Sequence, residues 1–349
     1  MDVTNFDDIK TYYGKVLSSS KDLKTSACCS TESLPVFARE VFPLLHPEVI
    51  ERFYGCGSPL PSVLEGKTVL DLGCGSGRDC YLLSKLVGPE GKVIGVDMTE
   101  EQLAVARRHI DYHTKKFGFQ KPNVNFLNGY IEDLKTAGIA SDSIDLIVSN
   151  CVVNLSPDKR RVFSEMLRVL KPGGEIYFSD VFADRRIPKR VQEDSICRGE
   201  CLGGALYTED FRRMLYQLGV FDFRVVAKSP ITLSDPHVLA MAGHIQFSSI
   251  TLRAFKIETL EDRCEDYGQV AYYLGTIPES PHEFVLDDHH TFAKKRPLLV
   301  CSNTAAMLKQ TRFAPHFRVE GDLSTHFGLF DCGPTTVSSV GPGAGGACC

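Results

Sequence analysis

The sequence lacks the features that mark membrane, secreted and nucleic-acid-binding proteins. No apolar run approaches the length that crosses a membrane, and the start, Met1 to Asp8, lacks the basic and apolar regions of a signal peptide. Basic charge is not in excess, because 39 Lys and Arg stand against 44 Asp and Glu, which gives a formal net charge of -5. A general electrostatic attraction to nucleic acid is therefore not expected. We expect a soluble cytoplasmic protein.

A disulfide framework is also absent from the sequence. The 13 cysteines are odd in number and scattered, and no secretion signal indicates an oxidising compartment. In a reducing cytosol we expect them to stay thiols. Cys74, Cys80, Cys264 and Cys301 are interpreted as small buried or passive residues.

The stretch from Thr68 to Asp79 reads TVLDLGCGSGRD, an apolar run followed by a glycine-rich turn. With the apolar residues after it, this predicts a buried strand, a tight turn and a helix. The Gly-Lys-Ser/Thr ending of a phosphate-binding loop is missing. Gly73, Gly75 and Gly77 are predicted to let the backbone approach a ligand closely. Asp71 would repel a pyrophosphate but can hold the ammonium group of S-adenosylmethionine.

The next apolar run, 92–97, ends in Asp97, about twenty residues beyond the turn, where a ribose-binding carboxylate is expected. The alternative is that Asp97 caps the following helix. Thr99 fits that role better, because Thr99 to Gln102 forms a capping box. The two features together favour a nucleotide-type ligand, with the turn Gly129 to Glu132 near its adenine.

The remaining pattern alternates strands and helices around one sheet. We predict seven strands, starting at Thr68 and continuing over 92–97, 123–128, 143–149, 175–179, 223–231 and 246–256, the last two as an antiparallel hairpin. Helices are expected over 99–117, 157–170 and 208–218, with an irregular connection over 180–206. The predicted domains are a helical lid at 1–55, the α/β domain at 56–256, a small α+β domain at 257–332 and a disordered tail at 333–349.

Two cysteines follow neighbouring strands of this sheet. Cys151 comes directly after the fourth strand, and Cys201 lies in the loop after the fifth. Carboxyl ends of strands in open sheets carry ligand sites, so both thiols should face the cofactor crevice. A packing role for Cys151 alone is about as probable as a functional one. Zinc is an alternative occupant, with Cys197, Cys201, Cys56 and Cys151 as ligands.

Five segments together resemble the arsenite methyltransferases, from about residue 10 to about residue 330. They are Tyr54 to Gly57, Asp71 to Asp79, Asp97 with Met98, Ser149 to Val152, and Gly199 to Tyr207. The resemblance implies a Rossmann-like class I S-adenosylmethionine-dependent methyltransferase fold. It implies that Cys151 and Cys201 hold trivalent arsenic, with Cys56 and Cys28 as the other functional thiols. Cys29 competes with Cys28 for that position, and Cys348 and Cys349 have no counterpart in the resemblance.

The expected reaction is stepwise methylation of arsenite to mono-, di- and trimethylated species. The resemblance implies Cys56, Cys151 and Cys201 as arsenic ligands and Cys28 as a further catalytic thiol. The expected cofactor-binding residues are Asp71, Gly73, Gly75, Gly77, Asp97, Met98, Ile131, Glu132 and Asn150. Glutathione or thioredoxin would serve as thiol reductant of a monomeric enzyme that accepts arsenite or its thiol conjugates. The alternatives are methylation of a small organic acceptor and a thiol-based metal-binding protein.

Overall fold

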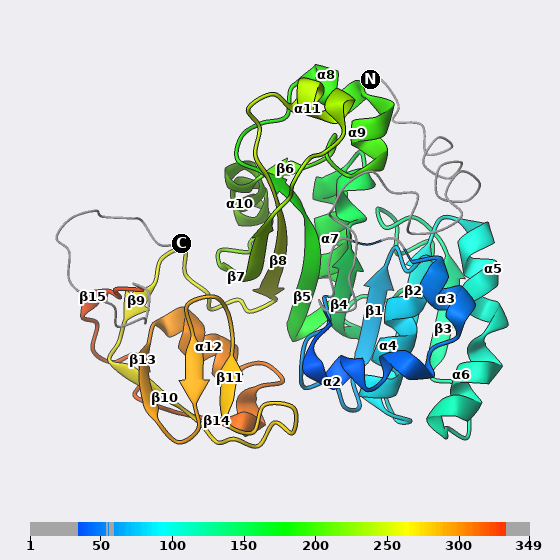
Figure 1. The fold of residues 1–349 in the computed structure, drawn as a ribbon. Coiled ribbons are helices and arrows are strands. Elements are labelled where there is room, and N and C mark those ends of the chain that lie inside the picture. The colour runs from blue at the N-terminus through cyan, green and yellow to red at the C-terminus, as the bar shows by residue number, and fades with distance from the viewer. Residues whose placement is uncertain (1–33, 54, 56–58, 333–349) are drawn as a thin grey trace.

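The computed structural model describes residues 34–53, 55 and 59–332 of the 349-residue chain. Their main feature is a mixed sheet with the order β3-β2-β1-β4-β5-β8-β7 (Figure 1). The strands of this path are β1 (Thr68–Leu72), β2 (Lys92–Asp97), β3 (Val124–Asn128), β4 (Ile144–Asn150), β5 (Leu170–Ala183), β7 (Phe223–Pro230) and β8 (Phe247–Phe255). Strands β1 to β5 pair in parallel, and β8 is antiparallel to β5 and β7. The predicted Rossmann-like sheet is confirmed.

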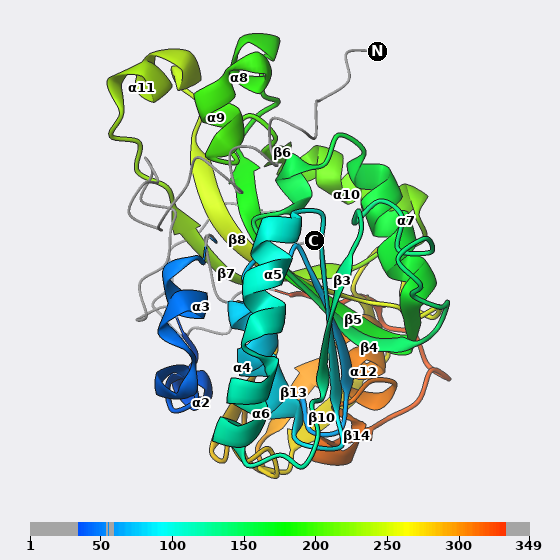
Figure 2. The same cartoon turned by 90° about the vertical axis from the view of Figure 1, so that its right-hand side faces the viewer.

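Helices cover both faces of this sheet, and a further group of helices lies above it in the view (Figure 2). In chain order they are α2 (Val36–Arg39), η4 (Phe42–Leu44), α3 (Pro47–Glu51), α4 (Arg78–Val87), α5 (Glu100–Arg108), α6 (Ile110–Phe117), η5 (Val153–Leu155), α7 (Lys159–Val169), α8 (Lys189–Glu193), α9 (Ser195–Gly199), α10 (Thr208–Gln217) and α11 (Pro236–Ala242). Apolar residues of α7 and α10 pack on one face of the sheet. Residues of α4, α5 and the segment from α2 to α3 pack on the other. No helix among the described residues has the length and apolar character needed to span a membrane.

Several predicted boundaries are wrong, each for a local reason. The helix expected over 99–117 is divided into α5 and α6 at His109, whose backbone leaves the helical region. Residues 171–174, which follow the helix expected over 157–170, belong to β5, because Gly173 and Gly174 exchange backbone hydrogen bonds with Lys256. The connection over 180–206 contains α8, α9 and the short strand β6 (Leu206–Tyr207), which pairs with β5. The connection between β7 and β8 is not a short hairpin turn but contains α11.

Residues after β8 form a small α+β domain with its own apolar core. Its elements are β9 (Glu265–Asp266), β10 (Gln269–Tyr273), β11 (Glu283–Val285), β12 (Thr291–Ala293), β13 (Pro297–Val300), α12 (Ser302–Lys309), η6 (Ala314–His316), β14 (Phe317–Glu320) and β15 (Gly328–Leu329). Three of the strands form a sheet in the order β13-β10-β14, and β9 pairs with β15. The predicted lid and tail lie mostly or wholly outside the described residues.

A buried carboxylate joins this C-terminal domain to the sheet. Glu175 in β5 is fully buried and accepts a hydrogen bond from Arg253 in β8 at 2.8 Å. Its other oxygen pairs with Arg312 from the C-terminal domain. Arg312 also donates to the carbonyl of Ser62, at 3.0 Å. One acid therefore holds cations from both domains.

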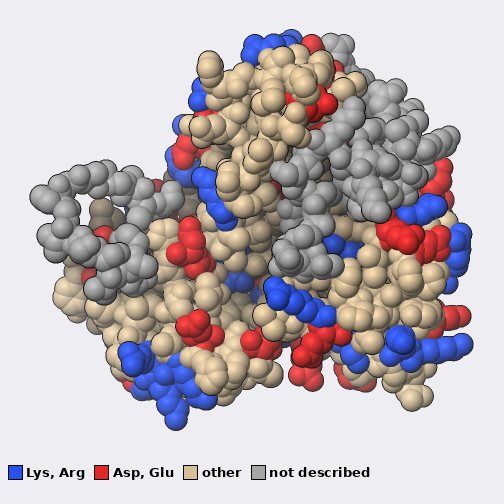
Figure 3. All heavy atoms as spheres, in the orientation of Figure 1, with Lys and Arg blue, Asp and Glu red and all other residues tan. Residues whose placement is uncertain are grey.

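The charged side chains on the face shown in Figure 3 include both signs across its width. This distribution agrees with the near balance of acidic and basic residues in the sequence.

Candidate active site

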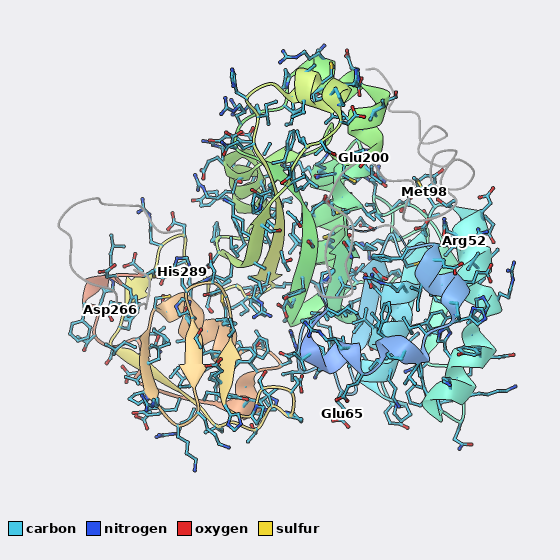
Figure 4. The ribbon with its side chains drawn as sticks, viewed as in Figure 1. Arg52, Glu65, Met98, Glu200, Asp266 and His289 are labelled. Atoms are coloured by element: carbon cyan, nitrogen blue, oxygen red, sulfur yellow. The ribbon has the colours of Figure 1, made fainter. Side chains whose placement is uncertain are left out.

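A pocket opens at the carboxyl ends of β1, β2 and β4. It is lined by eight of the nine residues predicted to bind the cofactor and by Cys151; the eight are Asp71, Gly73, Gly75, Asp97, Met98, Ile131, Glu132 and Asn150. Gly77 is the ninth and does not line it. In Figure 4, Arg52 and Met98 mark the side of this pocket near β2, and Glu200 marks the end of α9. The structure therefore gathers residues from most of the predicted segments at one edge of the sheet.

The three glycines of the turn serve different purposes. Gly75 has a φ of +50° and open space where a Cβ would stand, so its backbone faces the pocket. A Cβ on Gly73 would lie 2.3 Å from the side chain of Val152, and one on Gly77 would lie 2.9 Å from Phe126. The expected close approach of a ligand therefore applies to Gly75. Gly77 is required by its left-handed backbone at the start of α4, where φ is +86°.

Two carboxylates beside the turn, Asp71 and Asp97, have raised pKa values. Burial, and then the charge of Asp79, raises the pKa of Asp71 to about 8. Burial also raises the pKa of Asp97, although backbone amides of Thr99 and Gly75 oppose this shift. A carboxylate whose pKa is raised by burial is stabilised in its ionised form by an incoming cation. The site therefore fits the ammonium group of S-adenosylmethionine.

Asp79 is a pocket residue that the sequence analysis did not assign. It lies in the first turn of α4 and is buried. Its Oδ1 atom accepts from Arg78 Nη2 at 2.7 Å, and its Oδ2 accepts from Asn150 Nδ2 at 3.2 Å. Asp79 therefore connects the β1 turn to the end of β4. Its position directly after the glycine motif was the available signal.

Asp97 holds the glycine turn with one oxygen and the next helix with the other. Gly75 N donates to Oδ2 at 2.9 Å, and Thr99 N donates to Oδ1 at 2.8 Å. Thr99 occupies the N-cap position of α5 but makes no side-chain capping hydrogen bond, so the predicted capping box is wrong. The carboxylate can accept further hydrogen bonds from a ribose, because each oxygen has more than one lone pair.

The turn after β3 closes the pocket on its far side. Ile131 and Glu132 are both buried, and Glu132 accepts a hydrogen bond from the Ser156 hydroxyl. Ser156 follows η5, directly beyond the end of β4. This contact joins the expected adenine end of the pocket to the segment that carries Cys151.

Cys151 and Cys201 are both buried and both adopt a backbone that disfavours side chains. Their φ angles are +55° and +62°, in the left-handed region. Such residues cost about 1–3 kcal/mol each and concentrate at functional sites. The Sγ atom of Cys201 donates to the carbonyl of Cys151 at 3.3 Å. The two cysteines are therefore brought together, and Cys151 lines the pocket.

The glycine-rich loop after Cys201 explains how the two cysteines meet. A Cβ on Gly204 would lie 1.9 Å from the carbonyl oxygen of Asn154, so only glycine lets the loop pack there. Asn154 is fixed from the other side, because its backbone N–H donates to the carboxylate of the buried Asp180 at 3.0 Å. The loop from α9 is thereby held against the segment that follows β4.

Cys151 and Cys201 differ in oxidation state. Cys151 is disulfide-bonded, whereas the other cysteines of the described ranges, including Cys201, carry no disulfide. The expectation that every cysteine is a thiol is therefore wrong at Cys151. A disulfide sulfur is not a thiolate ligand, so Cys151 could serve as one only after reduction.

Lys159, at the start of α7, is a second functional candidate that the sequence analysis missed. Burial lowers its pKa, while the charges of Asp180, Cys201 and Glu132 act in the opposite direction. Its ammonium group donates to the Ser156 carbonyl at 3.0 Å. A cation near Cys201 favours the thiolate form of that residue. No motif in the sequence indicated that the charge of Lys159 acts on Cys201, because this depends on how the start of α7 lies relative to the loop after α9.

Three predicted thiols, Cys28, Cys29 and Cys56, lie outside the described residues, as do Cys348 and Cys349. Gly55 is described, and a Cβ on it would lie 2.8 Å from the side-chain amide of Asn150. The chain directly before Cys56 therefore reaches the pocket edge. Among the described residues, Cys197 forms no metal-ligating group with Cys151 and Cys201, so the zinc alternative gains no support.

Comparisons with known proteins agree with this architecture. A family model for a methyltransferase domain matches residues 64–219, and one for an arsenite methyltransferase C-terminal domain matches residues 266–329. An arsenite methyltransferase of Aquipseudomonas alcaligenes is 54% identical over 94% of this chain and 94% of its own. The human arsenite methyltransferase is 44% identical over 89% of this chain and 83% of its own.

A solved structure gives the same result. The arsenic(III) S-adenosylmethionine methyltransferase of Chlamydomonas reinhardtii matches with a TM-score of 0.83 at 49% identity, over 85% of this chain and 100% of that chain. The high identity over nearly the whole length confirms the resemblance seen in the motifs. This chain is a member of the arsenite methyltransferase family.

Proposed function

We propose that this protein transfers methyl groups stepwise from S-adenosylmethionine to trivalent arsenic held by cysteine thiolates. The observation that carries the proposal is the convergence of Cys151 and Cys201 at the edge of a pocket lined by buried carboxylates. A cation-binding pocket and a pair of soft ligands at one mouth suit a sulfonium donor and a thiophilic acceptor. Membership of the arsenite methyltransferase family supports the same pairing.

The cofactor end of the site is proposed to bind through charge and hydrogen bonding. When bound, S-adenosylmethionine supplies an electrophilic methyl group on its sulfonium. Asp71 would hold the ammonium group, and Asp97 would accept from the ribose hydroxyls. Gly75 leaves room for close approach, and Ile131 and Glu132 would contact the adenine. Asn150, bonded to Asp79, would orient the methionine end.

The thiol end is proposed to present arsenic to that methyl group. Trivalent arsenic bound by thiolates keeps a lone pair, and this lone pair can accept the methyl group directly. No general base is needed at the arsenic atom, unlike at a hydroxyl acceptor. Lys159 would favour the thiolate of Cys201 and so strengthen its bond to arsenic. The protein's main contribution would be alignment and exclusion of water.

A thiol reductant is proposed as the third participant. Methylation leaves arsenic formally pentavalent, and two thiolates can return it to the trivalent state by forming a disulfide, which accounts for both electrons. The disulfide at Cys151 is consistent with a thiol that cycles in this way. An external thiol, either glutathione or thioredoxin, would then reduce the protein. Cys28 is proposed as the partner in this step.

The number of thiolates should fall as methylation proceeds. Inorganic arsenite can form three bonds to sulfur, whereas monomethylated trivalent arsenic can form two. We propose Cys151 and Cys201 for every round and Cys56 for the first only. The Gly55 backbone beside Asn150 supports an approach of this segment to the site.

The test uses the purified full chain with arsenite, S-adenosylmethionine and excess thiol, followed by separation of the arsenic species. Methylated arsenic is expected, and its absence while a small organic acceptor is methylated would overturn the proposal. Cys56→Ser should lose methylation of arsenite yet keep methylation of monomethylated trivalent arsenic. Equal loss with both substrates would contradict the change from three ligands to two and assign Cys56 a structural or redox role.

A further inference from the structure

Three cysteines outside the active site meet in the C-terminal domain. The sulfur atoms of Cys264, Cys301 and Cys332 all lie within 4.8 Å of one another. Cys264 and Cys301 are buried and Cys332 is partly exposed. The sequence analysis interpreted Cys264 and Cys301 as passive, so the cluster revises that interpretation. Strands β9 and β15, which lie next to Cys264 and Cys332 in the sequence, are across the molecule from β1 and β2 in Figure 1.

The fold brings the three residues together from three distant segments. Strand β15 pairs with β9, with Leu329 opposite Glu265, and Phe330 N donates to the Cys264 carbonyl at 2.7 Å. This pairing sets Cys264 beside the chain that leads to Cys332. Cys301 arrives from β13 at the N-cap position of α12. Figure 4 labels Asp266 and His289, which lie in this same domain.

Cys301 is in surroundings that favour a thiolate. Its sulfur accepts from Thr304 N at 3.4 Å, at the N-terminus of the eight-residue helix α12. The guanidinium of Arg224 donates to the same sulfur at 3.8 Å. A thiolate with two thiols beside it is an arrangement that binds soft metals and metalloids.

We propose that Cys264, Cys301 and Cys332 form a second binding site for trivalent arsenic, separate from the site of methylation. The choice of arsenic rests on the proposed function, because that function supplies this metalloid to the protein. Three-coordination decides between arsenic and zinc: the group contains three sulfur ligands, whereas structural zinc takes four.

Charge leads to the same assignment. Trivalent arsenic with three thiolates is a neutral unit, and a neutral unit suits a buried position. Zinc with three thiolates would carry a net negative charge. Cys332, partly exposed, provides the entry for arsenite.

Binding requires no redox partner. Three As–O bonds of As(OH)₃ break and three As–S bonds form. Each thiol proton, or a solvent proton where the thiol is already ionised, leaves with a hydroxide as water. Arsenic remains trivalent throughout, so the cluster stores or delivers arsenite without transferring a methyl group.

The experiment starts from the reduced, metal-free full chain with Cys151→Ser and Cys201→Ser, which removes the active-site pair. Arsenite is added, the excess is removed by gel filtration, and arsenic per chain is measured by mass spectrometry of the element. Adding Cys264→Ser should reduce the bound arsenic by one atom per chain. Cys197→Ser is the matched control, a buried cysteine outside the cluster, and should change nothing. Equal arsenic content with and without Cys264 would overturn the proposal.

A second measurement uses the unaltered chain and does not depend on the folding of a variant. Arsenite should slow the alkylation of Cys332 by iodoacetamide at least tenfold, and peptide mass spectrometry measures this rate. An unchanged alkylation rate, or tightly bound zinc at one atom per chain that arsenite does not displace, would overturn the second site. If the unaltered chain bound arsenic in its C-terminal domain but methylated none, that result would instead count against the proposed function.

Discussion

The two halves of the active-site pocket are built by different physical means. The cofactor half uses the regular ends of parallel strands, with backbone amides of Gly75 and Thr99 held by Asp97. The thiol half uses two cysteines in left-handed backbone, held together by a loop that only glycine allows to pack. The cofactor half is therefore a property of the sheet, whereas the thiol half, proposed to hold arsenic, depends on loops with left-handed backbone. Damage to one half should leave the other intact.

The largest effect is expected from Cys201→Ser, which tests the thiol half alone. A hydroxyl is a hard, poorly ionised ligand, so arsenic should lose both an anchor and its alignment. Turnover with arsenite and with monomethylated trivalent arsenic should fall by about 10²-fold or more. Calorimetric affinity for S-adenosylmethionine should stay within error of the parent. Cys197→Ser serves as the control, and full activity of Cys201→Ser on either substrate would refute the thiolate mechanism.

Asp97→Ala reverses the comparison by damaging the cofactor half. Losing a charge-assisted hydrogen bond costs about 1.5–3 kcal/mol, which corresponds to roughly 10- to 150-fold weaker binding of S-adenosylmethionine. Arsenite binding should be nearly unchanged, because Asp97 contacts the glycine turn rather than the thiols. The exposed Asp111→Ala is the matched surface control. Equal cofactor affinity of mutant and parent by calorimetry would remove Asp97 from the site.

A smaller effect is expected from Lys159→Gln, which tests the electrostatics of the thiol half. Lys159 favours the Cys201 thiolate, so without it the thiol ionises at higher pH. The rise of turnover with pH should therefore shift to higher pH, with little loss at the alkaline plateau. A uniform loss at every pH would show that Lys159 acts through structure. Arg160→Gln, an exposed neighbour, provides the control.

The smallest effect is expected from removing residues 333–349. This segment contains Cys348 and Cys349 but lies beyond the last described residue, Cys332. Saturated turnover should stay unchanged, because none of the residues proposed for either half of the pocket belongs to this segment. The measurement is the rate at saturating arsenite, and a large drop would assign the terminal thiols a role in delivery.

The regular parts of the molecule could be predicted from the sequence, and the irregular parts could not. Apolar periodicity and glycine position set β1, β2 and the pocket between them, because these follow from local preferences. The left-handed backbone of Cys151 and Cys201, the Lys159 contact and the meeting of Cys264 with Cys332 depend on distant segments. The motif resemblance located the first pair of cysteines. Nothing local in the sequence indicated the second group.

Glu175 limits how freely the parts of this protein can be exchanged. Its side chain is fully buried and takes one cation from β8 and another from the C-terminal domain. Deleting residues 257–332 would remove Arg312, and breaking such a buried pair costs about 3–5 kcal/mol. The sheet and the C-terminal domain should therefore unfold in one transition. A chimera that replaces the C-terminal domain should fold only if the new domain brings a cation to the same place.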